Sequence, residues 1–199
     1  MIDLTKEQAF MVRQKVEMAE AITGFETENT YAVTTTEGET VAWANEQSGT
    51  LGRLFLRSHR PLRFAIADAG SKQIVARASR KFFWFFSHLH VSRGATPIGS
   101  IHRRWSFFAR RFTLVQPTDT PAATIRGPLF RPNTFMVNRD GMEVARITKA
   151  WSGFIKEGFS RADNFAVQFS DASLDNDFRL LVVAAALAID LDFFEDRNR

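Results

Sequence analysis

The chain has 199 residues, of which 45% are hydrophobic and 24% are charged, a balance typical of a folded protein with one sizeable core. It contains no cysteine, which excludes disulfide bonds, cysteine-ligated zinc, thiol catalysis and fatty acylation of cysteine. Its first residues show no basic segment followed by an apolar run, so we expect a cytoplasmic protein without a secretory signal.

The formal net charge of +4 is unevenly distributed along the chain. The residues up to Ser48 include three basic and nine acidic side chains. Residues 49–156 include nineteen basic and four acidic side chains, and the remaining residues include four basic and nine acidic ones. The basic middle segment attracts polyanions, which means phospholipid head groups or nucleic acid.

The N-terminal residues show a helical pattern. Thr5 and Gln8 have the spacing of a capping box, and apolar residues recur at roughly helical intervals from Phe10 to Ile22. We therefore expect an N-terminal helix within residues 1–24.

From Tyr31 to Phe169 the apolar residues alternate with a period of two, and turn residues such as Asp140 and Gly141 separate the short runs. The expected hairpins pair 31–33 with 41–43, 64–66 with 74–76, 89–91 with 98–101, 112–114 with 123–125, and 135–137 with 144–147. A sixth hairpin is expected within residues 151–169. About twelve strands in a meandering antiparallel sheet or barrel follow from this pattern.

The last element is an apolar helix, expected over residues 176–194. Its run from Leu180 to Ile189 has ten apolar residues, whereas a helix that spans a bilayer needs roughly 20. A helix that is apolar on every side must be surrounded by other apolar groups, so we expect the sheet to wrap around it. Asp175 and Asp177 at its start suit the positive end of the helix dipole.

Five segments now identify a family. They are QKVEMAEAITGFETENTYAV from Gln14, TPIGSIHRRW from Thr96, IRGPLF from Ile125, ITKAWSGFIKEGFSRADNFAVQF from Ile147, and AIDLDFFE from Ala188. In these segments the chain resembles the phospholipid scramblases of the tubby-like superfamily. The resemblance implies a closed antiparallel barrel of twelve strands that encloses a C-terminal hydrophobic helix. We therefore expect a β-rich α+β fold, one domain over residues 1–199, with the N-terminal helix outside the barrel.

Two departures from the family pattern affect function. Better-known members carry acylated cysteines where this chain has the FFWFF sequence of residues 82–86, so that route of lipid anchoring is excluded here. The family's proposed calcium segment has acidic residues where Arg161 and Ala172 stand in this chain.

The basic and aromatic segments around residues 80–86 and 103–112 are the main candidate site. Cations beside Trp and Phe are favoured at an anionic membrane interface, where each basic residue contributes about 1 kcal/mol. The candidate lipid contacts are Arg80, Lys81, Trp84, Arg103, Arg104, Trp105, Arg110 and Arg111. The alternative is that the aromatic side chains fill the barrel while the arginines are merely solvated.

Two further groups are candidates for metal binding. The aspartates offer oxygen ligands to calcium, although no EF-hand spacing is present. This group is Asp163, Asp171, Asp175 and Asp177, and its alternative role is a strand end and a helix cap. His88 and His90 would share one face of a strand, as a metal pair requires, but no third ligand is evident nearby. We expect no required cofactor.

No catalytic motif is present, so we do not expect an enzyme. The leading hypothesis is a scramblase-like protein that binds anionic phospholipid and associates peripherally with membranes. Lipid movement between leaflets follows only from the resemblance, because a compact barrel with a short apolar helix offers head groups no polar path across a bilayer. Two alternatives remain open, namely nucleic-acid binding with a role in transcription, and a protein-interaction scaffold.

Overall fold

The computed structural model describes residues 2–15, 30–47, 61–81, 87–150 and 164–194. Within these ranges the chain forms twelve strands followed by one helix. The strands are β1 (Ala9–Lys15), β2 (Thr30–Thr35), β3 (Thr40–Glu46), β4 (Leu62–Asp68), β5 (Ile74–Arg80), β6 (His88–Arg93), β7 (Thr96–Arg104), β8 (Ala109–Val115), β9 (Pro121–Pro128), β10 (Thr134–Arg139), β11 (Met142–Ala150) and β12 (Asn164–Phe169), and the helix is α3 (Asn176–Phe193).

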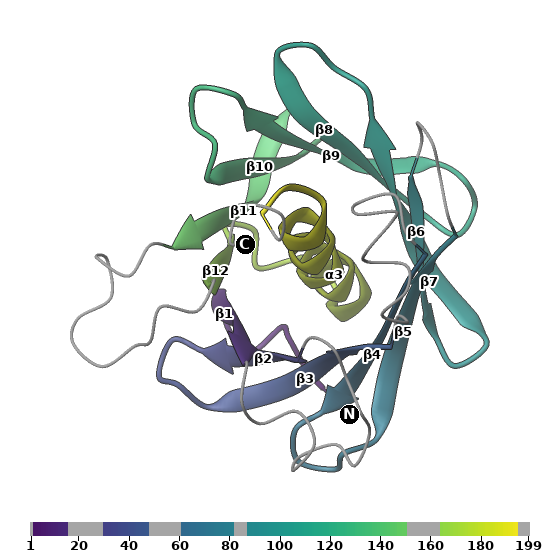
Figure 1. Ribbon diagram of the computed structural model, residues 1–199. Coiled ribbons are helices and arrows are strands. Elements are labelled where there is room, and N and C mark those ends of the chain that lie inside the picture. Colours follow the sequence, from purple (N-terminus) through teal and green to yellow (C-terminus); the bar gives the residue numbers. More distant parts are fainter. Residues whose placement is uncertain (1, 16–29, 48–60, 82–86, 151–163, 195–199) are drawn as a thin grey trace.

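The strands close into one antiparallel barrel around α3. Each strand pairs with its neighbours in sequence, and β1 pairs with β12 to complete the barrel. Figure 1 shows α3 in the centre, surrounded by the strands. Every residue of the helix from Phe178 to Leu191 is buried, as its apolar circumference requires. The expectation of a closed barrel of about twelve strands that encloses a C-terminal helix is confirmed.

The expected N-terminal helix is wrong where the structure describes it, because Ala9–Lys15 is strand β1. Met11 lies opposite Ala166 of β12 and Thr34 of β2, so β1 has a hydrogen-bonded partner on both sides. Phe10 and Val12 are both buried, and their spacing of two is the spacing of a strand. The need to close the barrel outweighed the helical pattern. Residues 16–24 lie outside the described residues.

The expected sixth hairpin is also wrong. Strand β12 has β11 and β1 as its two neighbours, so the twelfth strand of the barrel is β1. The five hairpins expected from residue 31 to residue 147 correspond to the pairs β2 with β3 through β10 with β11. Residues 151–163 lie outside the described residues.

Because neighbouring strands run in opposite directions, the connections fall at two ends of the barrel. We call one the capping end: α3 begins there, with Asp175 accepting a hydrogen bond from the Phe178 backbone N–H at 2.7 Å. We call the other the aromatic end: it carries the β7–β8 and β9–β10 connections, and α3 ends there. No helix in the described ranges is long and apolar enough to cross a membrane.

Candidate functional site

A row of three arginines crosses the outside of the barrel near the aromatic end. Arg104 of β7 lies directly opposite Arg111 of β8, and Arg111 lies directly opposite Arg126 of β9. All three are exposed, because residues at these positions of their strands face outward. We call these residues the arginine row.

Like charges directly opposite one another on neighbouring strands are destabilising. The Nε of Arg104 donates a hydrogen bond to Thr113 Oγ1 at 3.3 Å, and this partner is neutral. In the described part of the chain no carboxylate pairs with Arg111 or Arg126. The arginine row therefore weakens the fold, and an anionic partner would relieve its repulsion.

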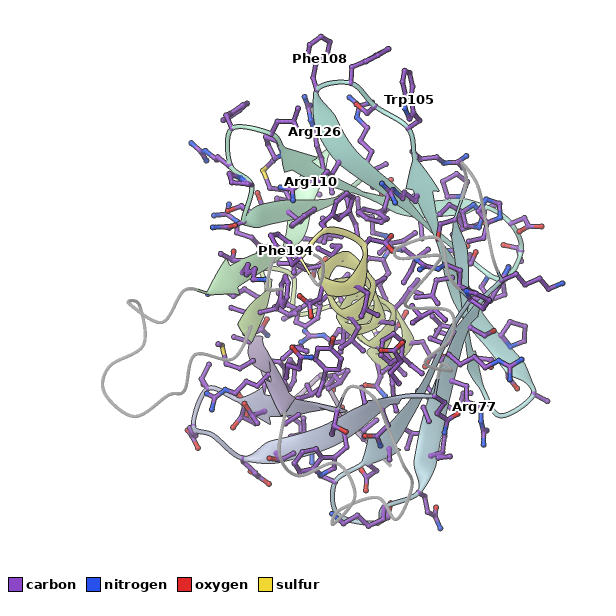
Figure 2. All side chains as sticks on the ribbon, in the orientation of Figure 1. Arg77, Trp105, Phe108, Arg110, Arg126 and Phe194 are labelled. Carbon is purple, nitrogen blue, oxygen red and sulfur yellow. The ribbon has the colours of Figure 1, made fainter. Side chains whose placement is uncertain are left out.

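A cluster of exposed apolar side chains lies beside the arginine row. In the β7–β8 connection Trp105 and Phe107 are each 71% exposed and Phe108 is 82% exposed. In the β9–β10 connection Leu129 is 54% and Phe130 is 83% exposed. We call these five residues the aromatic tip. Figure 2 shows Trp105 and Phe108 pointing away from the barrel.

The two connections that form the aromatic tip are neighbours. Ala109, which follows Phe108, lies opposite Pro128, which precedes Leu129. Within the first connection, the rings of Trp105 and Phe107 are in edge contact, with centroids 4.0 Å apart. The tip is thus one apolar surface built from two adjacent hairpins.

Two of the predicted lipid contacts, Arg103 and Arg110, lie at the mouth of the barrel instead of on its outer wall. The Arg110 guanidinium stacks 4.5 Å from the Phe135 ring centroid and also donates to the backbone carbonyl of Pro132. The Arg103 guanidinium lies 4.8 Å from the ring centroid of Phe193 in α3. These arginines hold the helix end and the β9–β10 connection against the barrel.

Arg80 is not a surface residue, so it does not contact head groups in this conformation. It is 4% exposed, and its guanidinium pairs with Asp192 of α3 at 2.6 Å. The next residue, Lys81, is exposed. Trp84 lies outside the described residues.

The described aspartates of the predicted calcium group are each bonded to the protein. Asp171 accepts hydrogen bonds from the hydroxyl and backbone N–H of Ser173, which lower the pKa of its carboxyl. Asp175 caps α3, and Asp177 pairs with Arg93 at 2.6 Å. Asp163 lies outside the described residues, and the described residues contain no group of three or more metal-ligating side chains. Calcium binding stays a prediction.

Of the two predicted histidines, His88 stacks on His102 beside the arginine row. The His88 ring lies on the His102 ring at 3.9 Å between centroids, and the Ser100 hydroxyl lies 2.8 Å from His102 Nε2. Burial is the main cause that lowers the pKa of each ring, and repulsion adds to it, from His90 and Arg104 for His88 and from His88, Arg104 and His90 for His102. Parallel stacking does not point the ring nitrogens at one shared ion.

Sequence reasoning missed Arg126 and the apolar pair Leu129 and Phe130. The predicted pairing of residues 112–114 with 123–125 already implies that Arg111 lies opposite Arg126, so extending that hairpin by one residue would have found it. No sequence signal identifies Leu129 and Phe130, because a strand pattern does not show whether the apolar residues of a connection are buried or exposed.

Comparison with known proteins adds one consistent result. The family described as Scramblase matches residues 2–196. Phospholipid scramblase 1 of Rattus norvegicus is 28% identical over 96% of this chain and 61% of its own length. Phospholipid scramblase family member 5 of Homo sapiens is 26% identical over 96% of this chain and 76% of its own length.

A yeast relative extends the comparison. Altered inheritance rate of mitochondria protein 25 of Saccharomyces cerevisiae is 22% identical over 98% of this chain and 73% of its own length. This chain spans only about three fifths of the length of the rat relative. No solved structure matches the chain significantly.

Proposed function

We propose that this chain, which belongs to the scramblase family, is a scramblase-like protein that binds the surface of membranes containing anionic phospholipids. The observation that carries the proposal is the arginine row beside the aromatic tip. Near an anionic bilayer each arginine contributes about 1 kcal/mol, and aromatic rings favour the layer of the head groups. The arginines of the row repel one another, and binding to the phosphates of a membrane would relieve this repulsion.

Movement of phospholipid between leaflets is the activity for which several relatives are named. We propose it for this chain as a second step that depends on surface binding. A dithionite assay with fluorescent lipid in reconstituted vesicles measures it directly. Faster loss of inner-leaflet fluorescence with protein than without would support this step, and equal rates would refute it while leaving surface binding intact.

Sedimentation of the purified chain with vesicles tests the binding step. We expect the chain to pellet with vesicles of phosphatidylcholine and phosphatidylserine, to stay in solution with phosphatidylcholine alone, and to dissociate as salt is raised. Parallel samples with calcium and with a chelator test the calcium prediction.

Equal binding to both vesicle types would contradict the anionic preference. Steeply salt-dependent binding to duplex DNA, with none to anionic vesicles, would replace the proposal with nucleic-acid binding.

A further inference from the structure

We infer that the aromatic tip enters the bilayer, so that the protein docks with the β7–β8 and β9–β10 connections toward the membrane and with the capping end away from it. This inference rests on the proposed function, because it says how the same surface meets an anionic bilayer. It adds that binding has an apolar component, placed on five named side chains.

The exposure of the tip is unusual within this molecule. The described residues include seven exposed large hydrophobic side chains, and five of them belong to the tip. The other two, Ile74 and Met142, stand at the capping-end starts of β5 and β11. Single exposed apolar residues are ordinary, whereas a cluster rimmed by polar groups marks an interaction site.

The distance between the tip and the arginine row fits a bilayer surface. Phe108 precedes Arg111 by three residues, which is at most about 10 Å along an extended chain. Interfacial apolar side chains reach roughly 5 to 10 Å below the head groups. Immersion of the tip therefore places the guanidinium groups of the row at the depth of the phosphates.

The charges of the described residues at this end favour an anionic bilayer over a second copy of the chain. Among the described residues, the carboxylates toward the aromatic end are Glu46, Asp190 and Asp192, and the side chains of all three are buried. No exposed carboxylate in these ranges would repel phosphate there. Two copies that met tip to tip would bring their arginine rows together, so self-association through this surface is opposed by charge.

The tip is also held in place by the core. Arg110 bonds to Pro132 in the second connection and stacks 5.3 Å from the ring centroid of Phe193 in α3. Both hairpins are thus joined to each other and to the end of the helix. A tip fixed in this way loses little freedom on docking, which favours insertion.

The test uses the absence of cysteine from the chain. Single variants Phe108→Cys, Phe130→Cys and the control Met142→Cys are labelled with an environment-sensitive fluorophore and mixed with phosphatidylcholine–phosphatidylserine vesicles. We expect a blue shift and quenching by nitroxide lipids at positions 108 and 130, with neither at position 142. Sedimentation of the same samples reports binding independently.

A second pair of variants measures the apolar component. Phe108→Ala with Phe130→Ala should weaken vesicle binding about tenfold for each side chain removed. Ile74→Ala with Met142→Ala is the matched control, and it should bind as the parent chain does.

The outcomes separate the two proposals. Vesicle binding without a spectral change at positions 108 and 130 overturns the insertion and leaves the proposed function standing. Absence of vesicle binding overturns both. A spectral change that needs no vesicles and rises with protein concentration shows that a second copy covers the tip, which also overturns the insertion.

Discussion

At the capping end Asp3, Asp68 and Asp171 accept hydrogen bonds within their own turns, whereas at the aromatic end the guanidinium groups of the arginine row have no carboxylate partner among the described residues. Asp68 accepts from the Ser71 backbone N–H at 2.8 Å, and Asp3 accepts from the hydroxyl and backbone N–H of Thr5 at 2.6 and 3.0 Å. These bonds lower the pKa of both carboxyls. Polar groups at the first end stabilise the chain itself. At the second end Arg80 and Arg110 also stabilise the chain, whereas the arginine row is the set of groups that we propose for binding to phosphates.

Buried arginines stabilise the fold at both ends, as the pair of Arg80 with Asp192 shows at the aromatic end. At the capping end Arg179 is fully buried, and its guanidinium donates to the carbonyls of Leu4 and Glu7 at 3.0 and 2.6 Å. It also donates to Leu174 and Asp171 carbonyls, and thereby ties the N-terminal segment to the start of α3. Arg179 is therefore a structural residue, and removing it should cost stability instead of binding.

The largest expected effect is therefore that of Arg179→Met. The variant leaves several buried carbonyls without a donor, so the free energy of unfolding should fall by about 3 kcal/mol in a urea titration. The same replacement at the exposed Arg111 should change it by less than about 0.5 kcal/mol. Equal losses at both positions would show that the two ends do not differ as described.

A smaller effect concerns pH. The folded pKa values of His88 and His102 are lowered, while the unfolded chain titrates near the ordinary value of about 6.5. The neutral rings therefore stabilise the fold fully above about pH 6.5, and this contribution is lost as the pH falls through the folded values. The same protonation adds charge beside Arg104, so binding to anionic vesicles should strengthen as stability declines.

Thermal unfolding and vesicle sedimentation on either side of about pH 6.5 check both signs. The control is the double variant His88→Gln with His102→Gln, in which both pH dependences should shrink. If the double variant kept the pH dependence of the parent chain, groups other than these two histidines would be its cause.

The sequence predicted the fold well wherever a local pattern and the global fold agree. The alternation around Phe112 and Ile125 gave the hairpin β8–β9, and the apolar run from Leu180 gave the enclosed helix. The pattern misled at β1, where Phe10 and Val12 fit both a helix and a strand and only the gap between β2 and β12 decides. The place between β2 and β12 is formed by residues far apart in the sequence, so the local pattern around β1 cannot reveal it.

The candidate site was predicted in part. Arg104, Arg111 and Trp105 are exposed as a lipid contact requires, whereas the position of Arg80 depends on Asp192, a residue more than a hundred positions away. A basic residue next to aromatic ones in the sequence can face the membrane or a buried carboxylate. Only the folded chain brings that carboxylate into place.

The most direct test of the account compares two double variants that remove equal charge. The first, Arg111→Ala with Arg126→Ala, deletes two members of the arginine row. The second, Lys72→Ala with Arg77→Ala, deletes two exposed cations elsewhere on the barrel. Figure 2 shows that Arg77 lies away from the tip. Sedimentation with phosphatidylserine-containing vesicles should show binding weakened about thirtyfold in the first variant, or about 2 kcal/mol, with its melting temperature unchanged or slightly raised. The second variant should bind nearly as the parent chain does, and equal weakening in both would show that net charge, and not this surface, binds the membrane.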